Sequence, residues 1–263
     1  MVLPLASADA DIGDEYTRYF DVVIAETEPL LDAAYRLRYQ VYCVENPFEN
    51  AQEHPDGREI DGEDDRSVHS VIVHKRTGAA AGAVRLILPD SDPSARPLPM
   101  LRLLSPDMRA RLVDLPVAST AEISRFAVSK DFRRRCGEDR YADVRSNDGS
   151  KPTAHERRLM PHLTYGLLRA IYQMSAEHDI THVCAVMEPA LLRLVGHFGF
   201  EFELLGLPVS YHGIRQPCFG KVTHMMESVR SKNPGLWRYM IGSECRNRTQ
   251  GARLQTGSVI ASA

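Results

Sequence analysis

The chain has 263 residues, of which 43% are apolar and 25% are charged, and its formal net charge at pH 7 is −3. This composition is typical of a globular protein and argues against a disordered, collagen-like or disulfide-stapled chain. The near balance of charge gives no overall basic field for nucleic-acid binding. No apolar run approaches the roughly 20 residues that a membrane-spanning helix needs.

The N-terminus and the cysteines indicate the compartment. The opening stretch, MVLPLASADADIGDEY, lacks the basic start of a secretory signal and soon turns acidic. The five cysteines are odd in number and far apart, and no C-x-x-C pair or Cys/His cluster indicates a metal site. We therefore expect reduced thiols in a soluble, cytoplasmic protein without a bound metal.

Helical and strand patterns alternate along the chain. Leu159, Leu163, Leu167 and Ile171 follow strict i, i+4 spacing, which is typical of a helix with one buried face. Short apolar runs bounded by turn formers are typical of strands. The predicted strands are 20–25, 67–75, 79–88, 119–129, 181–187, 200–206 and 218–229, and the predicted helices are 28–45, 105–115 (capped by Ser105), 153–177 and 188–198.

This interleaving, without an internal repeat or a dividing linker, predicts one α/β domain over residues 19–245. Its mixed central sheet is expected to carry helices on both faces. Residues 1–18 and 246–263 show no sustained period and are expected to be loose ends.

Polar residues gather at three points where the pattern predicts structure. An acidic run, E-I-D-G-E-D, occupies residues 59–64. It fits a calcium loop poorly, because Arg66 and Ile72 stand where the turn glycine and the bidentate glutamate belong. By spacing alone, a solvated acidic loop is the simpler interpretation.

The other two points lie inside predicted strands. Arg85 interrupts the apolar run AGAVRLIL, and if it is buried it needs carboxylate partners. Glu122 and Arg125 lie in AEISRFAV, where alternation places them on opposite faces unless a bulge intervenes. A structural ion-pair network and a catalytic site are both open for these residues.

Taken in order, these segments resemble a known family. The helix LRYQVYCVE is followed by E-x-D-x-x-D, G-x-V-R-L and E-x-S-R-F-x-V. This ordered set resembles the acyl-homoserine lactone (autoinducer) synthases, which have the Gcn5-related N-acyltransferase (GNAT) fold. The residues that match the family's motifs are Arg38, Tyr42, Asp61, Asp64, Arg85, Glu122 and Arg125.

The C-terminal half resembles a sister group. MEPALLRLVGHFGF and VSYHGIRQPCFGKV are similar to segments of N-acyl amino acid synthases and of acyltransferases associated with PEP-CTERM/exosortase systems. The autoinducer synthases carry a Trp in the loop after the first helix, whereas the single Trp here is Trp237 and Phe48 is the nearest aromatic residue. This departure favours the sister group over lactone synthesis.

The donor is expected to carry a phosphopantetheine arm. The Gly-rich pyrophosphate loop of acetyl-CoA-using relatives is absent after Val128, where the sequence is SKDFRRRCGEDR. A locally basic segment that includes Arg133, Arg134 and Arg135 suits acidic acyl-carrier protein, although CoA also carries phosphates. No permanently bound cofactor is expected.

The resemblance implies an enzyme that transfers a fatty acyl group to the amine of an amino acid or similar small molecule. Glu122 is the expected proton acceptor, and Arg85 and Arg125 either hold the acceptor's carboxylate or fix Asp61 and Asp64. A backbone N–H between Phe126 and Val128 is expected to stabilise the oxyanion. The alternatives are an acyl-homoserine lactone synthase and a non-catalytic protein that binds acyl groups or acyl-carrier protein; no nucleic-acid partner is expected, and peripheral membrane contact stays open.

Overall fold

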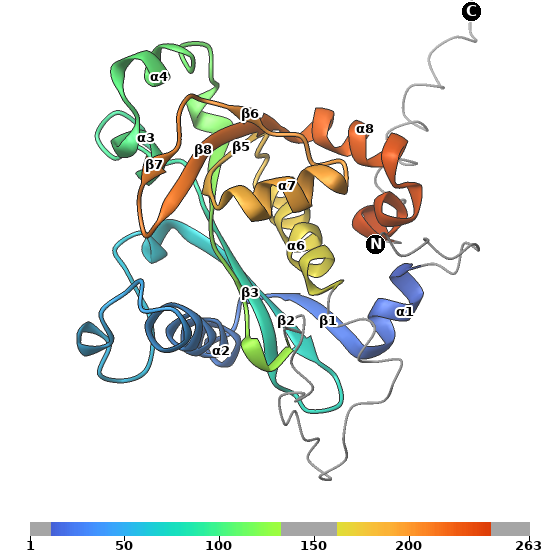
Figure 1. Cartoon of the computed structure of the whole chain (residues 1–263). Helices are drawn as coiled ribbons and strands as arrows, with labels where there is room; N and C mark the ends of the chain where they lie inside the picture. The colour runs from blue at the N-terminus through green and yellow to red at the C-terminus, as the bar shows by residue number, and fades with distance from the viewer. Residues whose placement is uncertain (1–11, 133–161, 243–263) are drawn as a thin grey trace, which may run out of the picture.

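A computed structural model describes residues 12–132 and 162–242. Its centre is a mixed sheet in which the strands follow the order β1-β2-β3-β4-β5-β8-β6, with β7 paired to β8 (Figure 1). All neighbouring strands are antiparallel except β4 and β5, which are parallel. The strands are β1 Phe20–Ile24, β2 Ser67–His74, β3 Ala80–Ile87, β4 Thr120–Val128, β5 His182–Met187, β6 Glu203–Leu204, β7 Val209–Ser210 and β8 Ile214–Lys221.

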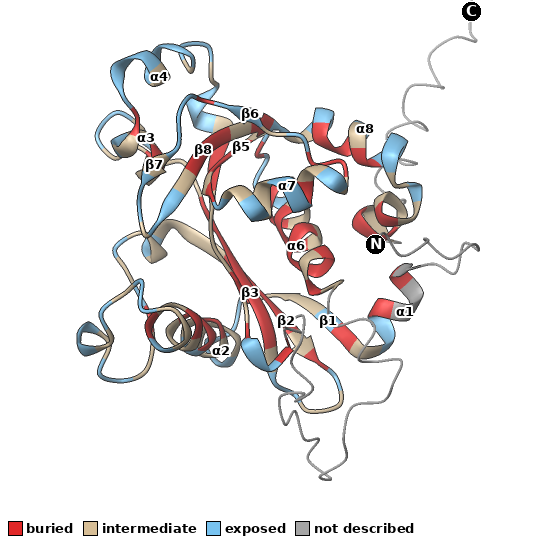
Figure 2. Ribbon diagram, in the orientation of Figure 1, coloured by how far each residue is buried: buried red, intermediate tan, exposed pale blue. Residues whose placement is uncertain are grey.

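Helices cover both faces of the sheet, which confirms the predicted α/β class. Helix α2 packs on one face of β2 and β3, and α6 packs on the other (Figure 1). Figure 2 shows buried residues along β2, β3 and the inner side of α6, as expected for strands covered on both faces. The helices are α1 Ile12–Tyr19, α2 Glu28–Tyr39, α3 Pro99–Leu103, α4 Pro106–Ala110, α6 Leu163–Glu177, α7 Pro189–His197 and α8 Val222–Lys232.

A β-bulge in β4 changes which side chains share a face. Ala83 pairs with Ala127 and Arg85 pairs with Ser124, so β4 holds one residue more than β3 between these pairs. Arg125 takes the extra position with a left-handed φ of 51°. Before the bulge the odd-numbered residues of β4 pack toward α6, and after it the even-numbered residues do.

Strands β4 and β5 separate soon after they pair. Their register covers only residues 120–122 of β4 and 182–184 of β5. The rest of β4 is paired on its β3 side, and the rest of β5 on its β8 side. The edges that face each other between β4 and β5 therefore remain open over residues 123–128 and 185–187.

Several sequence predictions need correction. The predicted helix 105–115 is helical only over Pro106–Ala110. Residues 12–19 form helix α1, with Tyr16 fully buried, although most of them were expected to be loose. The predicted strand 218–229 ends at Lys221, where α8 begins. Of the predicted strand 200–206, only β6 pairs with β8. The predicted Ser105 cap of α4 is confirmed, since its hydroxyl accepts a hydrogen bond from the Met108 N–H.

Candidate active site

The site is built on a buried arginine of α2. Arg38 is 1% exposed, and its Nε donates to Oε2 of Glu59 at 2.6 Å. Its two terminal nitrogens donate to the two carboxylate oxygens of Asp64 at 2.6 and 3.0 Å. This fork ties α2 to the acidic loop that precedes β2, so residues 59–64 form a structured wall and not a solvated loop.

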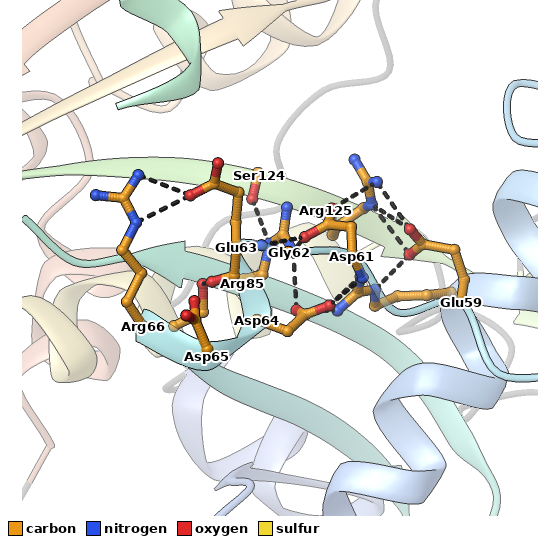
Figure 3. Close-up of polar contacts among 12 residues, drawn as sticks. Glu59, Asp61, Gly62, Glu63, Asp64, Asp65, Arg66, Arg85, Ser124 and Arg125 are labelled. Atoms are coloured by element: carbon orange, nitrogen blue, oxygen red, sulfur yellow. Dashed lines mark hydrogen bonds and ion pairs between the residues drawn. The ribbon is translucent and has the colours of Figure 1, made fainter. Parts of the chain in front are cut away.

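Arg85 extends the network from α2 to the sheet. Its Nη1 donates to Asp61 at 2.6 Å and to Asp64 at 2.8 Å, and its Nε donates to the Ser124 hydroxyl at 2.9 Å (Figure 3). Ser124 lies opposite Arg85 in the β3–β4 register. The carboxylate partners that a buried arginine requires are thus present.

The bulge brings Arg125 into the same network. Its guanidinium donates to Glu59 at 2.8 Å and to Asp61 at 3.0 Å (Figure 3). It also donates to Glu49 at 3.1 Å. Regular alternation would point this side chain to the opposite face of the sheet from Ser124. The left-handed backbone at Arg125 is therefore what places its charge in the site.

The buried charges balance one another. Burial alone would raise the pKa of Glu59, but hydrogen bonds from Arg125 and the charges of Arg38 and Arg125 lower it to about 2. Burial opposes ionisation of Asp64 as well, yet the bonds from Arg38 hold its pKa well below the ordinary range. The network therefore contains three arginines and three ionised carboxylates: Arg38, Arg85, Arg125, Glu59, Asp61 and Asp64.

Glu122 stands apart from this network. It lies opposite Ile87 in the register and is 6% exposed. Its Oε2 accepts a hydrogen bond of 2.7 Å from the backbone N–H of Met100, at the start of α3. Burial raises the pKa of Glu122 to about 7, although this hydrogen bond and the charge of Arg85 oppose the rise. Such a carboxyl group is suited to exchange a proton near neutral pH.

A cavity of about 640 Å³ lies along β4 between the network and the apolar core. Its polar part is lined by Asp61, Arg85, Glu122 and Arg125. Its other part is apolar and lies where β4 and β5 diverge, with residues from α6, α7 and β5: Leu168, Ile171, Ala185, Leu191 and Val195. The cavity therefore joins a charged compartment to an apolar one.

The structure brings most of the predicted site residues together. Tyr42, Phe126 and Val128 line the cavity. The Tyr42 hydroxyl donates a hydrogen bond of 3.4 Å to the Phe126 carbonyl oxygen. Arg38 and Asp64 do not line it, because they are buried behind Asp61 and Arg85, where they brace the wall. The predicted carrier-binding residues Arg133, Arg134 and Arg135 lie outside the described residues.

Four contributors were not predicted as site residues. Glu59 and Glu49 pair with Arg125, Ser124 orients Arg85, and the Met100 N–H binds Glu122. Glu59 stood in the acidic run, and its link to Arg38 spans 21 residues of chain, so spacing gave no signal for the pair. Within residues 12–132 and 162–242, no group of three or more His, Cys, Asp or Glu side chains is placed to hold a metal ion.

Comparison with known proteins identifies the fold. Residues 37–141 match the family model described as acetyltransferase (GNAT) domain. One similar structure is that of BjaI, a CoA-dependent acyl-homoserine lactone synthase solved with SAM and isopentyl-CoA. The match covers 83% of this chain and 89% of the BjaI chain, with a TM-score of 0.53 and 20% sequence identity. The chain has the GNAT fold.

A second similar structure is FeeM, an N-acyl amino acid synthase from uncultured soil microbes. The match covers 80% of this chain and 93% of the FeeM chain, with a TM-score of 0.52 and 14% sequence identity. No curated protein sequence matches the chain. The predicted resemblance to the autoinducer-synthase-like GNAT proteins is thus confirmed at the level of the fold, and both predicted groups occur among its structural neighbours.

The fold and the domain match bear out the prediction of an acyltransferase. No helix in the described part of the chain is long and apolar enough to cross a membrane.

Proposed function

We propose that this GNAT protein is a cytoplasmic N-acyltransferase that moves a fatty acyl group from a phosphopantetheine thioester to the amine of an amino acid or similar small acceptor. The observation that carries the proposal is the cavity, which joins an apolar compartment to a charged one beside Glu122. The fatty acyl chain of the donor needs an apolar compartment and the polar acceptor amine needs a charged one, and the two compartments must meet where the thioester reacts.

The divergence of β4 and β5 supports the donor half of the proposal. A pantetheine arm has amide groups that pair with open strand edges as an added strand would. Residues 123–128 of β4 offer such an edge. The apolar residues of α6 and α7 beyond it are placed to pack against the acyl chain.

Glu122 supports the chemical half. The acceptor arrives as an ammonium ion and must lose a proton before its nitrogen attacks the thioester carbonyl. Glu122 takes that proton and releases it to solvent, and the neutral amine nitrogen then attacks the thioester carbonyl to form a tetrahedral oxyanion. Glu122 takes a second proton from this nitrogen, the C–S bond breaks as the carbonyl re-forms, and the protonated carboxyl gives this proton to the leaving thiolate. A backbone N–H between Phe126 and Val128 stabilises the oxyanion that forms between these steps.

Acyl-carrier protein is the donor that we place first, because it is acidic and the segment from Arg133 to Arg135 is basic. Acyl-CoA is the second donor, since BjaI is described as CoA-dependent. Replacing Arg133, Arg134 and Arg135 together by Glu should slow acyl transfer from the carrier protein, mainly through KM.

Stopped-flow or steady-state assays over a salt series test this docking. Exposed charges act over about 10 Å at 0.1 M salt, so the defect should shrink as salt rises. The full chain with Arg109, Arg111 and Arg230 replaced by Glu provides a control of equal charge. Equal turnover of wild type and the 133–135 variant at low salt would contradict docking there.

Mass spectrometry of lipids from a bacterial host that expresses the chain tests the proposed function itself. N-acyl amino acids should accumulate, and their level should be at least about 100-fold lower in cells that express Glu122→Gln. Accumulation of acyl-homoserine lactones would favour lactone synthesis instead. No acylated product, together with tight binding of acyl-carrier protein, would favour a non-catalytic binding protein.

A further inference from the structure

Four arginines line the cavity, and one of them differs from the rest. Arg85, Arg102 and Arg125 each have a carboxylate oxygen within 3.4 Å. Arg215 also lines the cavity, but within the described residues it forms no ion pair; its Nη1 donates only to the neighbouring Ile214 carbonyl, at 3.3 Å. Its charge is therefore available to a ligand.

The position of Arg215 is fixed by the hairpin that carries it. It lies near the start of β8, opposite Val209 of β7. Its guanidinium carbon is 5.5 Å from the centre of the Phe48 ring, and that ring is 6.1 Å from the ring of His212. Stacking on an aromatic face leaves the edge of a guanidinium, with its N–H groups, free for a planar anion.

The other arginines of the site are already paired with carboxylates, which leaves them poorly suited to bind an anionic ligand. Arg38, Arg85 and Arg125 are matched by Glu59, Asp61 and Asp64, and Glu49 adds a further carboxylate 3.1 Å from Arg125. This group attracts the ammonium of an acceptor and repels its carboxylate. Among the cavity-lining arginines of the described residues, Arg215 on the hairpin side is the one without a carboxylate partner, so it is the best placed to bind a carboxylate on the acceptor.

We infer that Arg215 binds the carboxylate of the acceptor and so selects amino acids over amines that lack an acidic group. The inference rests on the proposed function and names its acceptor class. In this arrangement the amine lies toward Glu122 and the carboxylate lies against Arg215, which is a specificity residue and takes no part in the proton transfer. A bidentate Arg–carboxylate pair is strong and geometrically selective.

A competition assay tests the inference with the full chain. Each amino acid is mixed in equal amounts with its own carboxamide, an acyl-CoA or acyl-carrier donor is added, and the two products are counted by mass spectrometry. Carboxamides have the less basic amine and react more readily at neutral pH, so a preference for the acid reports binding. We expect wild type to prefer the acid by about 10- to 100-fold, and Arg215→Gln to reduce that preference to about twofold through KM.

Arg111→Gln is the matched control, because Arg111 is exposed and does not line the cavity. It should retain the wild-type preference. Thermal shift with each amino acid and its amide adds a readout without catalysis, in which the acid should stabilise wild type and not Arg215→Gln.

Each outcome is decisive. Acyl transfer without preference for the acid, or an unchanged preference in Arg215→Gln, overturns the role of Arg215 and leaves the proposed function standing. Arg215-dependent stabilisation by amino acids without any acyl transfer supports the binding site and counts against the proposed function. Neither transfer nor stabilisation by any amino acid contradicts both.

Discussion

Replacement of Glu122 by glutamine should lower turnover by roughly 10²- to 10⁴-fold while the protein stays folded, because glutamine retains the size of the side chain but accepts no proton. Its carbonyl oxygen can still accept the Met100 N–H that Glu122 accepts at 2.7 Å. In wild type the rate should rise as pH passes about 7, where Glu122 ionises. The variant should lack this rise, and its deficit should narrow at high pH, where more of the acceptor amine is already deprotonated.

The same substitution should have the opposite effect on stability. Because the pKa of Glu122 is about 7 in the folded chain and about 4.5 otherwise, the folded state holds its proton over that interval while the unfolded state releases it. The stability contribution is therefore full below about pH 4.5 and is lost as pH rises through about 7, a change of roughly 3 kcal/mol. Glu122→Gln avoids this loss, so its melting temperature relative to wild type should increase from pH 5 to pH 8.

Calorimetry and rate measurements on one sample separate catalysis from structure. Glu227→Gln, a change on the exposed side of α8, provides the control for altered charge. A Glu122→Gln protein that melts far below wild type at pH 8, yet turns over normally per folded molecule, would show that Glu122 is structural.

Replacement of Arg38 by methionine should lower the free energy of unfolding by about 3–5 kcal/mol, because it leaves Glu59 and Asp64 buried without their shared partner. Most proteins are stable by only about 5–15 kcal/mol, so this loss is large. Arg36→Met, two residues away on α2, provides a matched control. Arg36 has a 58% exposed side chain and pairs with Asp32, and its removal should change the free energy of unfolding little, because exposed ion pairs are screened by solvent.

The pH dependence identifies the cause of this loss. The pKa of Glu59 is lowered to about 2 in the folded chain, so its contribution is full above about pH 4.5 and is lost as pH falls toward 2. Wild type should lose stability over that interval more steeply than Arg38→Met, and the two should converge in acid. Urea unfolding from pH 7 to pH 3 measures both curves. A constant difference between them at every pH would mean that lost packing, and not charge, accounts for the defect.

The sequence predicted where the strands lie better than it predicted which face of the sheet each side chain occupies. The apolar runs 67–75 and 79–88 correspond closely to β2 and β3. For Arg125, alternation allowed two answers, and the bulge that decides between them has no sequence signal here because arginine, not glycine, takes the left-handed position. The extra residue becomes visible only when β4 pairs with β3.

Two other errors have different physical origins. In residues 222–232 the apolar Val222, Met225, Met226 and Val229 follow helical spacing, so the sequence did contain the signal for α8. The contacts of Glu59 had no such signal, because they depend on how a long loop folds back on α2 and β4. The acidic run was recognised, but its partners came from tertiary structure.

The bulge in β4 also bears on how relatives of this chain can diverge. Because one additional residue reverses the alternation, the inward or outward direction of residues 126–128 is set by the number of residues in the strand and not by their type. A point substitution at one of these positions changes only one side chain of the cavity lining. Deletion of a single residue between Ser124 and Ala127 would instead remove the bulge, turn Arg125 away from the site and exchange the inward- and outward-facing residues of the strand. Variation along this strand is therefore expected to be rich in substitutions and poor in changes of length.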